Sequence, residues 1–241
     1  LHIRAVGLNF RDVLNVLGAY PGDPGPPGAD CAGVWASNVT GTIVGEGAFG
    51  MAPGALGSMV STNMLMMPPK PKALSFEAVS GTPTVFVTVQ IAIQQANGTK
   101  ASDGMLVHAA TGGVGLAALQ LSAPLHCRCI GTAGGATKRA LVRSIGTKAA
   151  VGSRDTRFAD NSACADGSSF PGSVLNSLTS AGFLAATLSI LGTQARFVEI
   201  GKREVWGHHR LDLDRSDVSY HMLATDFLPV AANCLVSLHP L

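Results

Sequence analysis

The sequence has little charge and no excess of one sign. Asp, Glu, Lys and Arg make up 13% of its 241 residues, and the formal net charge is +2. A strong field of one sign draws proteins to nucleic acid or to anionic membrane surfaces, and this chain has none. Its longest apolar runs are interrupted by His108, Gly112, Gly113 and Gly115 before they reach membrane-spanning length. We therefore expect neither a nucleic-acid partner nor a membrane partner.

The sequence also lacks a paired cysteine pattern. Its five cysteines are odd in number and contain no C-x-x-C spacing. Disulfide frameworks and structural zinc sites both depend on such spacings. We therefore predict reduced cysteines, no metal site and a cytoplasmic location.

What the chain does have is apolar residues, at 46%, and glycine, at 29 positions. This composition is typical of a compact, loop-rich α/β enzyme. Residues 1 to about 80 are rich in glycine and proline, and the stretch AYPGDPGPPGADCAG can only form loops and turns. We expect a small, mostly β domain with long loops in this part.

The pattern changes after a predicted helix over 76–98, and strands then alternate with helices. Such alternation predicts a parallel sheet with helices on both faces. We place the boundary between the two parts within 82–95. Pro124 is expected to end or kink the helix that precedes it. The predicted strands are 105–110, 129–132, 149–151, 173–176 and 196–200, and the predicted helices are 114–121, 137–145 and 183–191.

A glycine cluster follows the first of these strands. Gly113-Val-Gly115-Leu-Ala-Ala118 fits G-x-G-x-x-A at the opening of a helix. In that motif the first glycine permits a tight turn, the second lets a pyrophosphate approach the backbone, and the third small residue lets the helix pack on the strand. The helix N-terminus then offers N–H groups to phosphates. The motif predicts a dinucleotide site, and the alternative is a glycine-rich turn without a ligand.

The residues after the second strand favour NADPH over NADH. An NAD site usually has Asp or Glu at this strand end, where it binds the ribose 2′-hydroxyl. Here the strand ends without an acid, and Lys138 and Arg139 follow. These cations would attract a 2′-phosphate. The alternative is that they form the solvated face of a helix.

Five stretches then resemble one family: VGLNFRDVLNVLGAYPG, HAATGGVGLAALQL, TAGGATKRALVRSIG, VLNSLTS and RFVEIGKR. Together they are similar to the enoyl reductase domain of modular polyketide synthases and animal-type fatty acid synthases. That domain belongs to the zinc-free, quinone-reductase-like branch of the medium-chain dehydrogenase/reductase superfamily. The resemblance extends from Ile3 to about Pro229.

The resemblance implies an α/β fold in which a GroES-like, β-rich substrate domain precedes a doubly wound Rossmann domain. We expect a partial substrate domain over 1–82, the NADPH-binding domain over 83–228, and over 229–241 the start of a return to the first domain. Measured against that pattern, the fold is expected to be truncated at both ends.

The implied reaction is reduction of an α,β-unsaturated thioester by NADPH. The implied partners are an acyl carrier protein, which carries the substrate on phosphopantetheine, and the other synthase domains. Two alternatives stay open. One is a stand-alone quinone or enone oxidoreductase, and the other is a non-catalytic structural domain with the enoyl reductase fold.

The resemblance also assigns candidate catalytic residues. Tyr20 and Lys202 match proton donors, Asp226 matches the acid that partners the lysine, and Asn9 matches a donor to the thioester oxygen. From the residues alone, Tyr20 reads equally as a loop anchor, Lys202 as a solvated charge, Asp226 as a helix cap and Asn9 as a turn residue. The expected cofactor-binding residues are Thr111, Gly112, Gly113, Val114, Gly115, Gly134, Gly135, Lys138, Arg139, Arg154, Asn176, Ser177 and Gly201.

Overall fold

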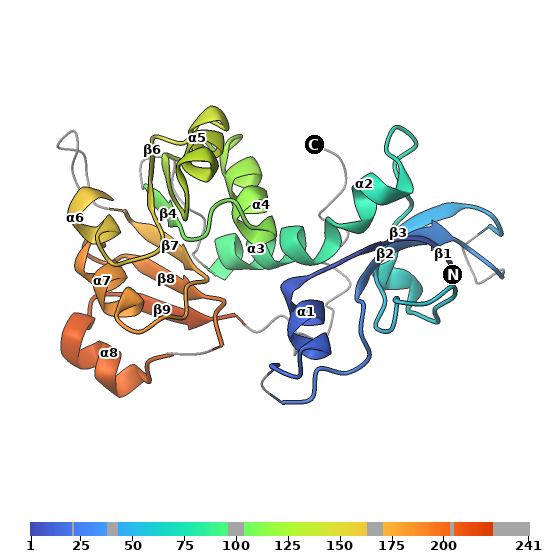
Figure 1. The fold of residues 1–241 in the computed structure, drawn as a ribbon, viewed down its shortest axis with the longest axis horizontal. Coiled ribbons are helices and arrows are strands. Elements are labelled where there is room, and N and C mark those ends of the chain that lie inside the picture. Colours follow the sequence, from blue (N-terminus) through green and yellow to red (C-terminus); the bar gives the residue numbers. More distant parts are fainter. Residues whose placement is uncertain (21, 38–42, 96–103, 163–170, 203–204, 224–241) are drawn as a thin grey trace. The chain divides into compact units, whose positions relative to one another are not determined.

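The computed structural model of the chain describes residues 1–20, 22–37, 43–95, 104–162, 171–202 and 205–223. The chain divides into two compact units between Val87 and Thr88. Figure 1 shows the elements of both units. Within the described residues, no helix is long and apolar enough to cross a membrane.

Unit 1 contains a three-stranded antiparallel sheet in the order β1-β2-β3. Its strands are β1 (His2–Gly7), β2 (Asp30–Val34) and β3 (Gly47–Met51). The short helix α1 (Phe10–Val16) follows β1, and the 3₁₀ turn η1 (Met64–Met66) and α2 (Phe76–Ser80) come later. A small core around Cys31, Trp35 and Met67 holds the sheet together. The predicted β character of this part is therefore present, but residues 30–33, which we expected to form loops and turns, belong to β2.

The single helix expected over 76–98 is two helices. Helix α2 ends at Ser80, and α3 (Pro83–Gln95) begins three residues later. Proline is favoured at the first helical position, where the missing N–H has no intrahelical acceptor, and disfavoured further in. Pro83 therefore starts a new helix, and the expectation of one continuous helix was wrong.

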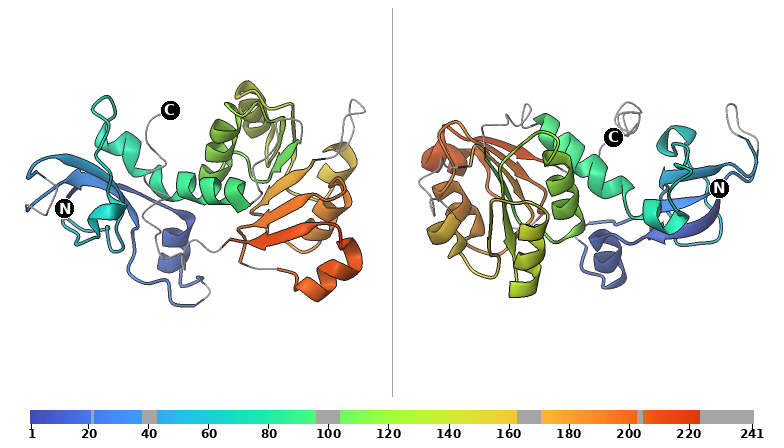
Figure 2. Two further views of the ribbon diagram at one scale, coloured as in Figure 1. Left: turned by 180° about the vertical axis from the view of Figure 1, so that it is seen from behind. Right: turned by 90° about the horizontal axis from the view of Figure 1, so that it is seen from above.

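Unit 2 is built on a six-stranded sheet in the order β6-β5-β4-β7-β8-β9. Every neighbouring pair in it is parallel. Helices α4 and α5 cover one face and α7 and α8 the other (Figure 2), as right-handed crossovers require. This order confirms the predicted doubly wound parallel sheet. The strands are β4 (Met105–Val107), β5 (Cys129–Ala133), β6 (Ala149–Gly152), β7 (Ser173–Asn176), β8 (Arg196–Glu199) and β9 (Ser219–Met222), and the helices are α4 (Gly113–Ser122), α5 (Ala136–Ser144), α6 (Phe158–Ser162), α7 (Phe183–Ser189) and α8 (His208–Arg215).

Two element boundaries in unit 2 compare differently with their predictions. Helix α4 ends at Ser122, two residues before Pro124, as the proline predicted. Strand β4 ends at Val107 and not at residue 110, because the chain turns and Ala109 adopts a left-handed backbone with φ of 48°. Alanine seldom adopts this conformation, so no residue type in the sequence signals the turn.

The core of unit 2 contains one fully buried imidazole. His108 Nδ1 lies 3.2 Å from Thr132 Oγ1, and Nε2 lies 2.9 Å from Thr187 Oγ1. The ring also packs edge-on against Phe158. Burial disfavours the charged ring and lowers the pKa of His108 to about 3. His108 therefore links β4, β5 and α7 as a neutral hydrogen-bonding group.

This burial makes stability depend on pH. Because the pKa of His108 is lower when folded than its ordinary 6.5, its contribution is present above pH 6.5 and declines as the pH falls toward 3. Between pH 8 and pH 5 we expect the free energy of unfolding of the wild type to fall by about 2 kcal/mol more than that of a His108→Gln variant. Urea unfolding of both proteins at pH 5 and pH 8 measures the difference. A parallel His2→Gln variant, altered at an exposed site, keeps His108, so its stability should differ from that of the wild type by the same amount at both pH values. A His108→Gln difference that is constant with pH would contradict the prediction.

A second prediction concerns the contact between α4 and β4. A Cβ on Gly115 would lie 2.6 Å from the Ala109 carbonyl oxygen and 2.6 Å from the Ala110 Cα. Backbone atoms cannot move aside cheaply, so Gly115→Ala should lower the free energy of unfolding by about 2–3 kcal/mol. Chemical denaturation measures this loss. The matched control is Gly152→Ala, at the end of β6, where an added Cβ meets no atom within 4 Å. Equal stability of the two variants would show that the close contact is absent.

Candidate functional site

The candidate site of unit 2 lies at the carboxyl ends of its parallel strands. In an open sheet of this order, ligands bind where the strand order reverses, outside the carboxyl ends. Here that point lies between β4 and β7, which are paired neighbours. The loops that follow β4, β5, β6, β7 and β8 carry the predicted cofactor residues. The fold therefore brings these loops to one edge.

The glycine cluster opens α4 at this edge. Gly112 is the N-cap residue, Gly113 is the first helical residue, and both are exposed, while Thr111 and Val114 are half-buried. The first N–H groups of a helix have no intrahelical acceptor, so they face outward here. Gly115 is buried against the turn after β4. The structure thus buries Gly115 as well as Ala118, the residue to which we had assigned helix packing, and it leaves Gly112 and Gly113 as the exposed glycines.

Positive side chains gather after β5 and β6. Arg139 Nη1 donates to the Ala133 carbonyl at the end of β5 over 3.5 Å. The Arg154 side chain lies beside Gly134, since a Cβ there would be 3.4 Å from Arg154 Nε. Lys138 is exposed on the first turns of α5, whose N-cap is Gly135. This part of the edge therefore combines three cations with two glycines.

The two predicted residues at the end of β7 make internal contacts. Asn176 is buried, its Nδ2 donates to the Leu178 carbonyl over 3.1 Å, and its Oδ1 accepts from the Leu178 N–H over 3.1 Å. Ser177 Oγ donates to the His108 carbonyl over 3.4 Å, which ties the end of β7 to the turn after β4. The Asn176 side chain thus holds the turn in which Ser177 lies.

The end of β8 contains an acid that the sequence analysis did not select. Glu199 is buried, its Oε2 accepts from Asn176 Nδ2 over 2.6 Å, and its Oε1 accepts from the Gly201 N–H over 2.6 Å. Burial raises the pKa of Glu199 to about 7, although both hydrogen bonds oppose the rise. A charged residue inside the apolar strand RFVEI was the available sequence signal.

Gly201 and Lys202 follow directly. A Cβ on Gly201 would lie 2.6 Å from Thr179 Cγ2 and 2.7 Å from Glu199 Oε1, so a side chain there would displace these two groups. Lys202 is exposed at the carboxyl edge of the sheet. Asp226, the predicted partner of Lys202, lies outside the described residues.

Unit 1 carries the other two candidates, held by two buried acids. Asp12 accepts from the Asn9 N–H and the Gly28 N–H, each over 2.8 Å. Asp30 accepts from the N–H of Thr84 over 3.1 Å and from its hydroxyl over 2.6 Å. Burial raises the pKa of Asp30 to about 6. Because Thr84 is the second residue of α3, Asp30 anchors the start of that helix.

Asn9 lies against this acid. Its side-chain amide lowers the pKa of Asp30, yet the buried Nδ2 makes no hydrogen bond of normal geometry. Tyr20 is half-buried, and the Arg11 guanidinium lies over its ring at 5.8 Å from the centroid. Arg11 also donates to the Pro24 carbonyl. Asn9 and Tyr20 therefore flank the proline-rich loop of unit 1.

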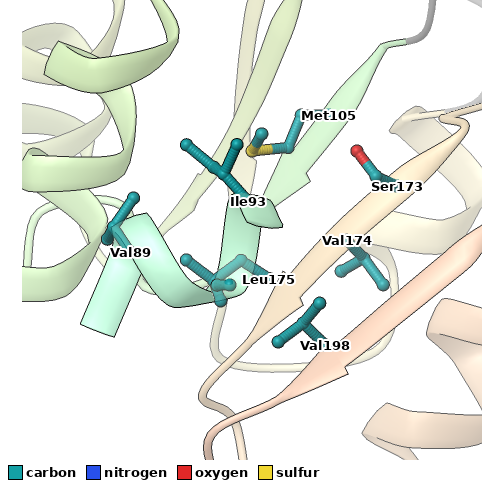
Figure 3. A pocket seen from close by; sticks show the side chains of 8 residues that line it. Val89, Ile93, Met105, Ser173, Val174, Leu175 and Val198 are labelled. Atoms are coloured by element: carbon teal, nitrogen blue, oxygen red, sulfur yellow. The ribbon is translucent and has the colours of Figure 1, made fainter. Parts of the chain in front are cut away.

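A separate pocket lies within unit 2 between α3 and the sheet (Figure 3). Apart from Ser173, whose buried Oγ has no hydrogen-bond partner, its lining is apolar. Met105 and Ser173 begin β4 and β7, and Leu175 and Val198 lie one residue before the ends of β7 and β8, so the pocket runs along the strands. Among the described residues, no group of three or more His, Cys, Asp and Glu side chains could hold a metal ion.

Curated relatives of the chain are polyketide synthase components. The chain is 37% identical over 223 residues to the pikromycin synthase component PikAII of Streptomyces venezuelae, covering 90% of this chain and 6% of the relative. It is 35% identical over 227 residues to the spectinabilin synthase protein NorB of Streptomyces orinoci, with 90% and 10% covered. The chain thus spans a tenth or less of these relatives. No family model matches the chain.

Solved structures of enoyl reductases have the same fold. CurK enoyl reductase superposes with a TM-score of 0.87 at 30% identity, over 98% of this chain and 76% of that one. JamJ enoyl reductase gives a TM-score of 0.90 at 25% identity, over 98% and 75%. The Escherichia coli quinone oxidoreductase complexed with NADPH, at 23% identity, TM-score 0.85 and the same coverage, shares the fold.

These likenesses confirm the predicted fold class, a GroES-like part followed by a Rossmann part, and they confirm the predicted enzyme class. The antiparallel sheet of unit 1 and the parallel sheet of unit 2 correspond to those two parts. The chain therefore belongs to the enoyl reductases, oxidoreductases of the medium-chain dehydrogenase/reductase superfamily.

Proposed function

We propose that the chain reduces the α,β double bond of an acyl thioester with NADPH. The observation that carries this proposal is the carboxyl edge of unit 2, where an open helix N-terminus, three cations and Lys202 follow successive strands. Membership of the enoyl reductases supports the reaction type.

The residues of this edge fit a dinucleotide. Gly112 and Gly113 are exposed and bear no side chain at the start of α4, where N–H groups face outward. A helix of this length offers a partial positive charge to a diphosphate. Because Gly115 is packed against the turn after β4, these N–H groups are held at the sheet edge. We assign the diphosphate to Gly112–Val114.

The choice of NADPH over NADH is supported by charge. Strand β5 ends at Ala133 and is followed by Gly134 and Gly135, with no acid to bind a ribose 2′-hydroxyl. Lys138, Arg139 and Arg154 surround this strand end and would attract a 2′-phosphate.

When bound, NADPH supplies a hydride to the β-carbon of the substrate. The α-carbon then takes a proton, and the product is the saturated thioester. Lys202 and Tyr20 are the candidate donors of that proton, and the amide of Asn9 is the candidate donor to the thioester oxygen as negative charge develops there. The Asn9 Nδ2 carries two hydrogens, so one can face Asp30 while the other is donated to the thioester oxygen. We retain Asp226 as the proposed partner of Lys202.

We further propose that unit 1 is the substrate domain and unit 2 the cofactor domain. The proposed substrate is a phosphopantetheine thioester on an acyl carrier protein, and other synthase domains are the proposed neighbours. The support is that the curated relatives are polyketide synthase components many times longer than this chain.

Cofactor choice is tested by reversing one charge. Lys138→Glu should weaken NADPH binding at least about tenfold and leave NADH binding nearly unchanged, because only NADPH carries the 2′-phosphate. Titration of cofactor fluorescence measures both affinities. Lys72→Glu, an exposed site in unit 1 with the same change of charge, is the control. An equal loss for both cofactors would remove the assignment of Lys138, and failure of the wild type to bind NADPH would favour a non-catalytic domain.

The reaction is tested by NADPH oxidation with a crotonyl-pantetheine thioester. Loss of a positioned proton donor commonly costs about 10²-fold or more, so we expect Lys202→Ala to lower kcat by about that factor and Tyr20→Phe to lower it less. Lys72→Ala is the control and should retain wild-type kcat. No turnover of the thioester by folded wild-type protein would overturn the proposed reaction. Turnover of a free quinone in its place would support a stand-alone oxidoreductase.

A further inference from the structure

Glu199 is a buried acid at the sheet edge that the proposed reaction uses. It is the last residue of β8 and pairs in register with Asn176, the last residue of β7. Its exposed fraction is only 3%. A carboxyl group at such a position costs free energy unless hydrogen bonds compensate for lost water. Its contacts therefore indicate what the acid does.

Both carboxyl oxygens face donors from different loops. Asn176 Nδ2 donates to Oε2 and the Gly201 N–H donates to Oε1, each over 2.6 Å. An ionised carboxylate only accepts, so it satisfies both donors, whereas a protonated carboxyl must present its own hydrogen to one of them. The two hydrogen bonds therefore favour the ionised form, while burial opposes it.

These two contacts reach residues of the proposed active site. Asn176 also binds the Leu178 backbone through both ends of its amide, and so fixes the turn that contains Ser177. Gly201 immediately precedes Lys202. The absent Cβ of Gly201 leaves the space that Glu199 Oε1 and the Thr179 methyl group fill. One carboxylate therefore sets the turns after both β7 and β8.

We propose that Glu199 is a positioning residue for the reduction, because its carboxylate fixes the Asn176 amide and the Gly201 N–H and thereby the Lys202 backbone. The proposal rests on the proposed function for the consequence at Lys202. The contact itself can be tested independently of any activity.

Ionisation of Glu199 gives the proposal a pH signature. Burial raises its pKa to about 7, so the carboxylate is lost as the pH falls through neutrality. Among the described residues, strand β7 places the uncharged Asn176 against Glu199. The turn after β8 contains Gly201 and then Lys202. Strand β9 presents Tyr220, whose pKa is raised well above its ordinary value by burial and by the charge of Glu199. Tyr220 therefore stays neutral over the range in which Glu199 titrates.

The first experiment observes the contact directly. The amide proton of Gly201 in the ¹⁵N-labelled wild-type chain should shift with pH along a curve centred near the pKa of Glu199, about 7, and the same amide in Glu199→Gln should not. This readout needs no substrate. A Gly201 amide that does not titrate across neutral pH in the wild type would overturn the proposal, whether or not the chain reduces enoyl thioesters.

The second experiment measures kcat against pH with the crotonyl thioester. Glutamine keeps the size of Glu199, but its amide has one oxygen acceptor and one NH₂ donor. The NH₂ group must therefore face either Asn176 Nδ2 or the Gly201 N–H, and that hydrogen bond is lost. We expect kcat of Glu199→Gln to fall about tenfold on the alkaline side of neutrality and to lose the wild-type rise across neutral pH, with KM for NADPH changed less than about threefold. Glu46→Gln, at an exposed site, is the control.

A conservative variant separates positioning from general structural damage. Glu199→Asp keeps an ionisable carboxylate at the end of β8, whereas Glu199→Gln has none. We expect Glu199→Asp to retain a rise of kcat across neutral pH and, on the alkaline side, a kcat at least about threefold above that of Glu199→Gln. A wild-type pH profile in Glu199→Gln, or a flat profile in folded Glu199→Asp, would overturn the positioning role. Absence of wild-type turnover would instead overturn the proposed reaction, and the Gly201 titration would still decide the contact.

Discussion

The close approach of α4 to the turn after β4 is the constraint on which the candidate site depends. A side chain on Gly115 would overlap the backbone of Ala109 and Ala110, so the helix can start at the sheet edge only because that side chain is missing. The N–H groups of its first turn are held at the end of β4 as a result. Since all six strands are parallel, the ends of β5, β7 and β8 meet the same edge. This packing contact thus sets the place of the helix N-terminus, and the parallel strand order sets the place of the other groups in unit 2 that we assign to the site.

Buried polar groups then fix the loops at that edge and in unit 1. His108 joins three elements through two threonine hydroxyls, and Ser177 joins its carbonyl to the end of β7. Asp30 performs a comparable role in unit 1 by binding the first turn of α3. Unpaired polar groups are costly when buried, and here each is hydrogen-bonded to another segment, His108 to two of them. Because hydrogen bonds are stronger in the low-dielectric interior, these few contacts hold the loops in place.

Much of the Rossmann part follows from the sequence because its signals are local. The apolar strand runs, the glycine cluster and the proline after α4 each act on neighbouring residues, and Ser173–Asn176 was predicted with the bounds that the structure has. The turn at Ala109 could not be predicted, because its left-handed backbone follows from the packing of β4 and α4. The break before Pro83 was visible in the sequence and was misread as the interior of a helix. Glu199 was overlooked because its meaning depends on Asn176, 23 residues earlier in the chain.

The same edge is electrically asymmetric, and the asymmetry follows from strand order. Lys138, Arg139 and Arg154 surround the ends of β5 and β6, whereas Glu199 ends β8 on the other side of β4. In the proposed complex, phosphate groups are therefore attracted toward β5 and away from β8, where a buried negative charge would repel them. A dinucleotide can then bind in only one direction, with its phosphate-bearing adenosine half at β5 and its nicotinamide half toward β8. Lys202, three residues after Glu199, thus lies at the end of the site where a proton donor is needed.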